Sequence, residues 1–289
     1  MFKTRRRQLI YLMTLQCEDQ PGIVHAASTA IVAVGGNILE NDQFTDPVTN
    51  LFCMRTRFET LTGETENVRD RLSADLSRFA PTLGLRPEGV RRRALIMVST
   101  SDHCLTDLLY RQENGDLRID IVAVVANHPD LEPLAARYNI PFYEVPVTAA
   151  TKLEAEARLR DLVEDFAVDF VVLARYMQVL SPELCDELRG RIVNIHHSFL
   201  PGFKGARPYH QAYERGVKLI GATAHFVTAE LDDGPIIDQD VVRVSHARTP
   251  HELVALGRDV ERVVLARAVK LLAEDRVALV GRRTVIFSQ

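Results

Sequence analysis

Four short apolar runs, separated by longer stretches with helical character, constrain the fold of this chain more than any other feature. They cover residues 94–99, 119–126, 168–173 and 192–195. Runs of this length with few polar residues are typical of strands buried on both faces, and strands that alternate with helices build a mostly parallel sheet. We therefore expect a Rossmann-like α/β domain over residues 94–289. A further strand at 221–227 and a long helix at 249–273 belong to it.

The first 88 residues have a different pattern, which predicts a separate domain. Apolar β-rich runs and helical stretches follow in the order strand, helix, strand, strand, helix and a final strand, which is the βαββαβ order of a ferredoxin-like fold. The predicted elements before the final strand are 8–17, 22–34, 37–44, 51–58 and 66–79. Pro81, Gly84, Pro87 and Gly89 indicate a linker, and we place the domain boundary at 89–93.

Composition and charge exclude several classes of function. The formal net charge is −4, so no global basic field favours nucleic acid, and the basic clusters at 5–7 and 91–93 are expected to be solvated flanks. No apolar stretch approaches the roughly 20 residues that span a bilayer, and no cleavable hydrophobic segment follows the N-terminus. We expect a cytoplasmic protein. The four cysteines are dispersed, which indicates neither a zinc knuckle nor a disulfide framework.

Asn194, His196 and Asp232 are the candidate catalytic residues. Asn194 and His196 alternate along a predicted strand, so both side chains should project to one side. An amide and an imidazole aimed at one point suit an oxyanion developing on a carbonyl, and a nearby carboxylate suits general acid–base catalysis. Taken singly, each has a structural alternative, since a strand Asn or His is commonly a satisfied polar group and an Asp before Gly is commonly a turn residue.

The longer pattern changes this balance. Asn-Ile-His-His-Ser-Phe-Leu-Pro at 194–201, followed by His-Phe-Val at 225–227 and Leu-Asp-Asp-Gly-Pro at 231–235, resembles the folate-dependent formyltransferase superfamily. The resemblance implies that Asn194, His196 and Asp232 are the catalytic trio. Its deformylase branch is similar over residues 9–287, which implies hydrolysis of 10-formyltetrahydrofolate to tetrahydrofolate and formate, with this folate as substrate and no further cofactor.

One feature of the residues favours hydrolysis over formyl transfer. Transformylases of the superfamily carry a Gly-rich phosphate-binding turn after their first strand, whereas here 94–98 leads into Ser-Thr-Ser-Asp-His without glycine. Asp102 should repel a phosphate ester. The structural alternative is that Ser101 or Asp102 caps a helix beginning near His103. Transfer to an amine, and a folate sensor without catalysis, remain the rival functions.

The resemblance also implies a pterin pocket and auxiliary residues. An apolar slot suits a flat pterin ring. The residues expected to line it are Met177, Val179, Leu180, Val227 and Thr228. His225 is expected to orient Asp232 or a water, or to be structural, and Arg175 is a candidate ion-pair residue. His197 should face away from His196 unless the chain turns before Pro201.

Two further expectations concern a lid and a metal. A loop with Gly205, Pro208 and His210 is a candidate lid over the cleft. His196, His197, His210 and His225 fit no standard zinc spacing, so we expect no metal site.

The first domain resembles the ACT family of regulatory modules. The segment at 18–24 and Gly-Gly-Asn-Ile-Leu at 35–39 carry this resemblance, which implies binding of amino acids between paired copies. Pro21 is expected at the first helical position, where free N–H groups attract a carboxylate. The candidate effector residues are Asp19, Gln20, Gly22 and Ile23. Capping alone, with the domain serving only to form a dimer or tetramer, is the alternative.

Overall fold

The computed structural model describes residues 9–60, 64–202 and 208–288, and it divides into two compact units. Unit 1 comprises Met1–Arg91 together with Glu274–Gln289, and unit 2 comprises Arg92–Ala273. The C-terminal residues therefore pack with the N-terminal part of the chain, whereas the sequence pattern had placed all of 94–289 in one domain. Of the features expected from the sequence, the basic cluster at 5–7 and Gly205 lie outside the described residues.

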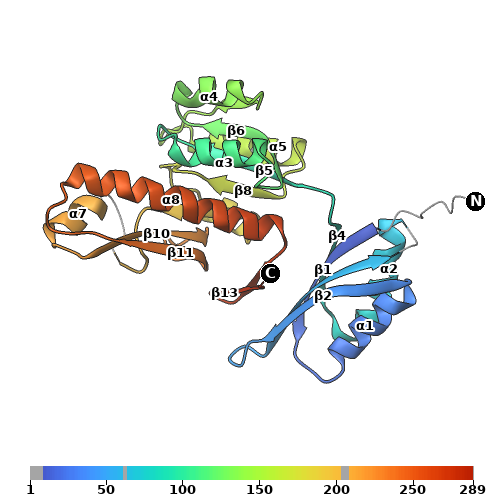
Figure 1. Cartoon of the computed structure of the whole chain (residues 1–289). Coiled ribbons are helices and arrows are strands. Elements are labelled where there is room, and N and C mark those ends of the chain that lie inside the picture. Colours follow the sequence, from blue (N-terminus) through green and yellow to red (C-terminus); the bar gives the residue numbers. More distant parts are fainter. Residues whose placement is uncertain (1–8, 61–63, 203–207, 289) are drawn as a thin grey trace, which may run out of the picture. The chain divides into compact units, whose positions relative to one another are not determined.

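Unit 1 is built on an antiparallel four-stranded sheet of order β2-β3-β1-β4 (Figure 1). Its elements follow the βαββαβ order: β1 (Leu9–Glu18), α1 (Ile23–Ala33), β2 (Gly36–Thr45), β3 (Leu51–Thr60), α2 (Thr65–Leu76) and β4 (Thr82–Pro87). Alternate residues of β1, among them Met13 and Leu15, pack with Ala27 and Ile31 of α1 in one core. The period of two along the strand thus matches the apolar face of the helix.

Two details of unit 1 differ from the expectations. Helix α1 begins at Ile23, after Gly22 with φ 95°, so Pro21 is not its first residue. Glycine adopts this left-handed conformation more easily than other residues, and the turn at Gly22 sets the start of the helix. In addition, the expected final strand, β4, contains Gly84 and Pro87, which had suggested the beginning of a linker; its pairing with β1 outweighs the effect of these residues.

The opposite face of this sheet is covered by the end of the chain. Strands β12 (Val277–Val280) and β13 (Arg283–Ile286) form a hairpin, and Cys53 of β3 is buried against Val280 and Phe287. The neighbours of Cys53 in β3 point instead into the core beneath α1 and α2. The sheet is therefore packed on both of its faces.

Unit 2 contains a seven-stranded sheet of order β11-β10-β9-β8-β5-β6-β7. The five strands from β9 to β7 are parallel, while β10 and β11 extend the sheet in antiparallel pairing. The strands are β5 (Arg92–Val98), β6 (Ile119–Ala126), β7 (Phe142–Glu144), β8 (Phe170–Leu173), β9 (Ile192–His196), β10 (Leu219–Phe226) and β11 (Ile236–Arg243). A mostly parallel sheet is what the apolar runs predicted, except that β5 begins at Arg92, inside the expected linker.

Helices cover both faces of this sheet (Figure 1). They are α3 (His103–Glu113), α4 (Glu132–Arg137), α5 (Lys152–Asp165), α6 (Pro182–Glu187), α7 (Pro208–Glu214) and α8 (Pro250–Ala273). Leu95 and Met97 of β5 pack with Leu159 of α5 on one face. Helices α3 and α8 contact each other, and α8 packs on β10 and β11. None of the helices in the described ranges is long and apolar enough to cross a membrane.

Candidate active site

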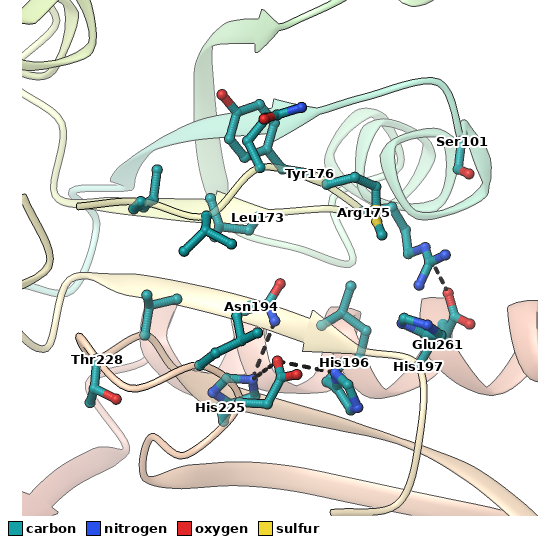
Figure 2. A pocket seen from close by; sticks show the side chains of 18 of the residues that line it. Ser101, Leu173, Arg175, Tyr176, Asn194, His196, His197, His225, Thr228 and Glu261 are labelled. Atoms are coloured by element: carbon teal, nitrogen blue, oxygen red, sulfur yellow. Dashed lines mark hydrogen bonds and ion pairs between the residues drawn. The ribbon is translucent and has the colours of Figure 1, made fainter. Parts of the chain in front are cut away.

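The described part of unit 2 contains a cavity of about 540 Å³ at the carboxyl ends of β5, β8 and β9 (Figure 2). Strand β5 is the point from which the chain runs first towards β7 and later, through β8, towards β9. Ligands of open α/β sheets bind at such a switch point. The cavity is lined by residues that lie far apart in the sequence, from Ser101 to Glu261.

Asn194 projects into the cavity from β9 and is oriented by His225 of β10. The two residues are direct partners in the β9–β10 register, and Asn194 Nδ2 lies 3.2 Å from His225 Nε2. His225 Nδ1 donates to the carbonyl of Phe226 at 2.8 Å, so a neutral ring accepts at Nε2. Burial lowers the pKa of His225, which favours this neutral form. The amide of Asn194 is thereby fixed with one N–H left for another acceptor.

His196 lies two residues further along β9 and contacts Asp232. Its Nδ1 is 3.1 Å from Asp232 Oδ1, while its Nε2 is buried and has no hydrogen-bond partner among the described residues. Burial alone would raise the pKa of Asp232, but the hydrogen bond and charge of His196 outweigh it, so the pKa is lowered. Asp232 is therefore ionised, and His196 presents a free ring nitrogen to the cavity.

The loop after β10 brings Asp232 to this position. Asp232 has φ 55°, in the left-handed region, and Gly234 follows two residues later. A Cβ on Gly234 would lie 1.7 Å from the carbonyl oxygen of Phe226, so only glycine allows the loop to approach β10 this closely. His225 Nε2 is 3.9 Å from Asp232 Oδ1, which is too long for a hydrogen bond. The direct contact of His225 is thus with Asn194.

The apolar end of the cavity contains the residues expected to hold a pterin. Met177, Val179, Leu180, Val227 and Thr228 all line it. Met177 and Val179 are each 58% exposed, whereas Leu180 is also part of the core beneath the sheet. The Ser99 hydroxyl accepts the backbone N–H of Met177 at 3.0 Å and so ties this loop to the end of β5.

The other end of the cavity is polar and centres on Glu261 of α8. Glu261 accepts a hydrogen bond from Tyr209 at 2.6 Å, lies 2.8 Å from His103 Nε2, and lies 3.5 Å from Arg175 Nε. Burial would raise the pKa of Glu261, but the contacts with His103, Arg175 and Tyr209 lower it. The sequence offered one signal for this residue: on α8, Glu261 lies in line with buried Leu253, Gly257 and Leu265.

His197 lies between the catalytic candidates and this polar end. Its ring centroid is 5.1 Å from that of His196 and 6.2 Å from that of Tyr209. Although it follows His196 directly, it lines the same cavity, and so does His210. Burial, and then the charge of Arg175, lowers the pKa of His197 to about 4, which leaves the ring neutral near pH 7.

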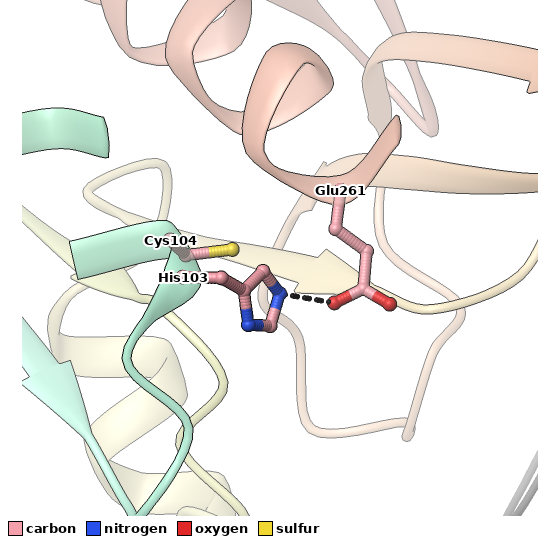
Figure 3. Close-up of side chains that lie close together, drawn as sticks. All are labelled: His103, Cys104 and Glu261. Atoms are coloured by element: carbon pink, nitrogen blue, oxygen red, sulfur yellow. Dashed lines mark hydrogen bonds and ion pairs between the residues drawn. The ribbon is translucent and has the colours of Figure 1, made fainter. Parts of the chain in front are cut away.

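Three side chains at the polar end could in principle hold a metal: ligand atoms of His103, Cys104 and Glu261 lie within 4.8 Å of one another (Figure 3). However, His103 Nε2 is directed at the carboxylate of Glu261. Burial also raises the pKa of the Cys104 thiol well above its usual value, which disfavours the thiolate that a metal requires. The chemistry of these side chains fits a hydrogen-bonded network better than a metal site.

The loop between β5 and α3, which has no glycine, was expected to cap α3 through Ser101 or Asp102. Asp102 is the residue before the helix, but its side chain makes no capping hydrogen bond. Ser101 and His103 line the cavity instead.

Comparison with known proteins places this geometry in a family. A family model described as formyl transferase matches residues 92–269. A formyltetrahydrofolate deformylase of Corynebacterium sp. (strain P-1) is 47% identical over 281 residues, which is 96% of this chain and 98% of that protein. The crystal structure of a formyltetrahydrofolate deformylase from Burkholderia mallei is 48% identical, with a TM-score of 0.93 over 97% of this chain and 100% of that chain. The chain belongs to the formyltetrahydrofolate deformylase family.

Membership of the deformylase family accounts for both units of the chain. The crystal structure of glycinamide ribonucleotide transformylase 1 from Symbiobacterium toebii is 32% identical, with a TM-score of 0.64, and covers 68% of this chain and 94% of that one. The deformylases instead align along nearly the whole length, so unit 1 is part of what they share with this chain.

Proposed function

We propose that this protein hydrolyses 10-formyltetrahydrofolate to tetrahydrofolate and formate, and that Asn194, His196 and Asp232 catalyse the reaction. The observation that carries the proposal is the unpartnered Nε2 of His196, buried in the cavity beside the oriented amide of Asn194 and the ionised Asp232. Two donors and a carboxylate around one point suit attack of water on a carbonyl.

The substrate fits the two ends of the cavity. The pterin ring lies between Met177, Val179, Leu180 and Val227 at the apolar end, which places the formyl group on N10 near Asn194 and His196. The formyl oxygen then accepts from Asn194 Nδ2 and, when the imidazole is protonated, from His196 Nε2. Each such donor contributes about 3 kcal/mol to lowering the barrier.

Asp232 moves the protons. Its Oδ1 faces His196 Nδ1, so Oδ2 is the oxygen that takes a proton from the attacking water. The new C–O bond gives a tetrahedral oxyanion held by Asn194 and His196. Asp232 then returns the proton to N10, the C–N10 bond breaks, and formate and tetrahydrofolate are released. No amine acceptor takes part in this sequence.

The proposal is tested by replacing Asp232 with Asn. Because the carboxylate is the proton acceptor, we expect Asp232→Asn to lower turnover by about 10²- to 10⁴-fold while folate binding persists. The measurement is release of formate from 10-formyltetrahydrofolate with no amine added. The matched control is Asp233→Asn, which removes the neighbouring carboxylate, one that does not line the cavity.

The outcomes of this assay separate the rival functions. Wild-type release of formate without an acceptor identifies a hydrolase. Turnover only after an amine is added would identify a transferase, and folate binding without turnover in either condition would identify a sensor. An Asp232→Asn variant as active as the wild type would remove Asp232 from the mechanism.

We further propose that unit 1 is an ACT-like module and that the carboxylate of an amino-acid effector binds at the start of α1. Gln20 and Gly22 are exposed there, Asp19 is half-buried, and Ile23 is part of the core. The first turn of α1 has no acidic side chain and no side-chain cap, so its N–H groups are open to a carboxylate. Titration of single amino acids into the deformylase assay tests this idea. A change in rate that persists in Gly22→Ala would argue against this site.

A further inference from the structure

Arg175 occupies a backbone conformation that favours glycine. Its φ is 66°, in the left-handed region, although it is neither glycine nor asparagine. It lies two residues after the end of β8, where the chain turns into the loop that carries Met177. A long charged side chain at a strained position in a cavity wall indicates that the side chain itself is needed there.

The guanidinium of Arg175 is held at the polar end of the cavity. Its Nε is buried, makes no hydrogen bond among the described residues, and lies 3.5 Å from Glu261 Oε2 (Figure 2). The carboxylate of Glu261 is fixed in turn by Tyr209 and His103. A Cβ on Gly257 would lie 2.1 Å from the ring of Tyr209, so this glycine of α8 makes room for the tyrosine. Arg175 is thus ion-paired with a carboxylate that Tyr209 and His103 hold by hydrogen bonds.

The position of this cluster bears on the approach of the nucleophile. If the pterin fills the apolar end, the attacking group approaches Asn194, His196 and Asp232 from the polar end, where the cluster lies. His197 connects the two regions, since its ring is close to those of His196 and Tyr209. The charge of Arg175 reaches this ring, because it contributes to the low pKa of His197.

We propose that Arg175 is a specificity-determining residue that keeps amine acceptors away from the formyl group and leaves water as the nucleophile. Its side chain fills the approach sterically, and its positive charge repels an ammonium group. Water is small and neutral and is not excluded. This inference rests on the proposed function, because it concerns the choice of nucleophile within the same site.

Removal of the side chain should open a route to formyl transfer. In the opened site, the nitrogen of an amine forms a bond with the formyl carbon and loses a proton to Asp232. The C–N10 bond then breaks and N10 receives that proton. The products are a formylated amine and tetrahydrofolate, and no oxidant or reductant is needed. Glu261, freed of Arg175, would face the incoming amine as a hydrogen-bond acceptor.

The test is the partition of formyl groups between water and an added amine. Full-length wild type and Arg175→Gly are incubated near pH 7 with 10-formyltetrahydrofolate and glycinamide, a bulkier amine than water whose amino group is mostly an ammonium at this pH. Formate and N-formylglycinamide are quantified after subtraction of the uncatalysed reaction. Glycine adopts φ 66° without strain. We expect the ratio of formylglycinamide to formate to rise about tenfold or more in Arg175→Gly, which is a typical effect of reshaping a specificity pocket.

Two control variants separate the effect of losing the Arg175 side chain from the effect of introducing a glycine into the backbone. Asn139→Gly places a glycine at another residue with positive φ, 56°, outside the cavity, and should partition like the wild type. Arg175→Lys keeps the charge and most of the length and should also favour formate. Circular dichroism and folate binding verify that each variant is folded, and Arg175→Ala replaces Arg175→Gly if the latter is not.

Several results would overturn the inference. One is an unchanged partition in Arg175→Gly. Another is a folded, folate-binding variant that has lost both reactions, since Arg175 would then serve hydrolysis itself. Wild-type enzyme that readily formylates glycinamide would also overturn it, and this outcome needs no variant. Failure of the proposed function is distinct, because it would appear as absence of formate release from wild type without amine.

Discussion

His197 and His225 are kept neutral by burial, each in a place where a charge would disturb its neighbours. The neutral ring of His225 accepts at Nε2 and orients the amide of Asn194. The neutral ring of His197 lies between His196 and Tyr209, close to the cation of Arg175. Both histidines therefore contribute to the site through their uncharged form, and this has a consequence for stability in acid.

The free energy of unfolding should fall as the pH drops from 6.5 towards 4. His197 has a folded pKa of about 4 against an ordinary value of 6.5, so in this window the unfolded chain binds a proton that the folded protein does not. The loss is up to about 1.4 kcal/mol per pH unit for one such group. In His197→Asn, denaturant unfolding at a series of pH values should show a shallower decline. His25→Asn, which changes an exposed histidine, should match the wild type. Equal slopes in all three proteins would refute the assignment.

At the scale of helices and strands, the sequence predicted what depends on local periodicity. Strand β6 has the predicted limits, and α8 begins one residue after the predicted start. The Asn194 and His196 positions followed from alternation along β9. The helix predicted at 22–34 begins within one residue of α1, but Pro21 is not its first residue, because the left-handed Gly22 comes before the helix. The final strand of unit 1 was predicted without limits, because those of β4 are set by its long-range pairing with β1.

The polar end of the cavity could not be predicted in the same way. Glu261 meets His103 and Tyr209 only because α3, α7 and α8 converge there, and these residues are separated by 158 and 52 positions in the chain. A glutamate in the apolar stripe of a helix indicates that the carboxylate has a buried partner, but the sequence does not show which residue that partner is. The residues next to Arg175 in the sequence do not indicate that its backbone is left-handed. The site therefore had to be completed from the three-dimensional arrangement of the elements.

At the scale of the whole chain, the last residues of the sequence stabilise unit 1. Helix α8 carries Glu261 in unit 2, and the chain continues from its end into the β12–β13 hairpin of unit 1. Within unit 1, Arg283 contacts the buried carboxylate of Asp46 at 2.7 Å, and Arg86 contacts Asp275 at 2.7 Å. The hairpin therefore supplies both apolar and charged contacts to the N-terminal sheet.

Phe287 is the side chain on which this packing can be tested. It is 4% exposed and packs with Cys53, Ala278 and Val280, whereas the preceding Ile286 is 40% exposed. Phe287→Ala removes a buried ring and leaves a cavity, so we expect it to lower the free energy of unfolding of unit 1 by about 3 kcal/mol. Ile286→Ala is the matched control and should cost far less, because its side chain is already in contact with water.

The two variants also distinguish a structural hairpin from a loosely attached tail. If the hairpin is an integral part of unit 1, thermal unfolding of Phe287→Ala should begin at a lower temperature, and proteolysis should become faster within the first 90 residues as well as at the C-terminus. Cleavage confined to the C-terminus, with the N-terminal sheet as resistant as in the wild type, would mean that the hairpin adds little to that sheet. The first outcome would make residues 274–289 part of the N-terminal folding unit, in spite of their position at the other end of the sequence.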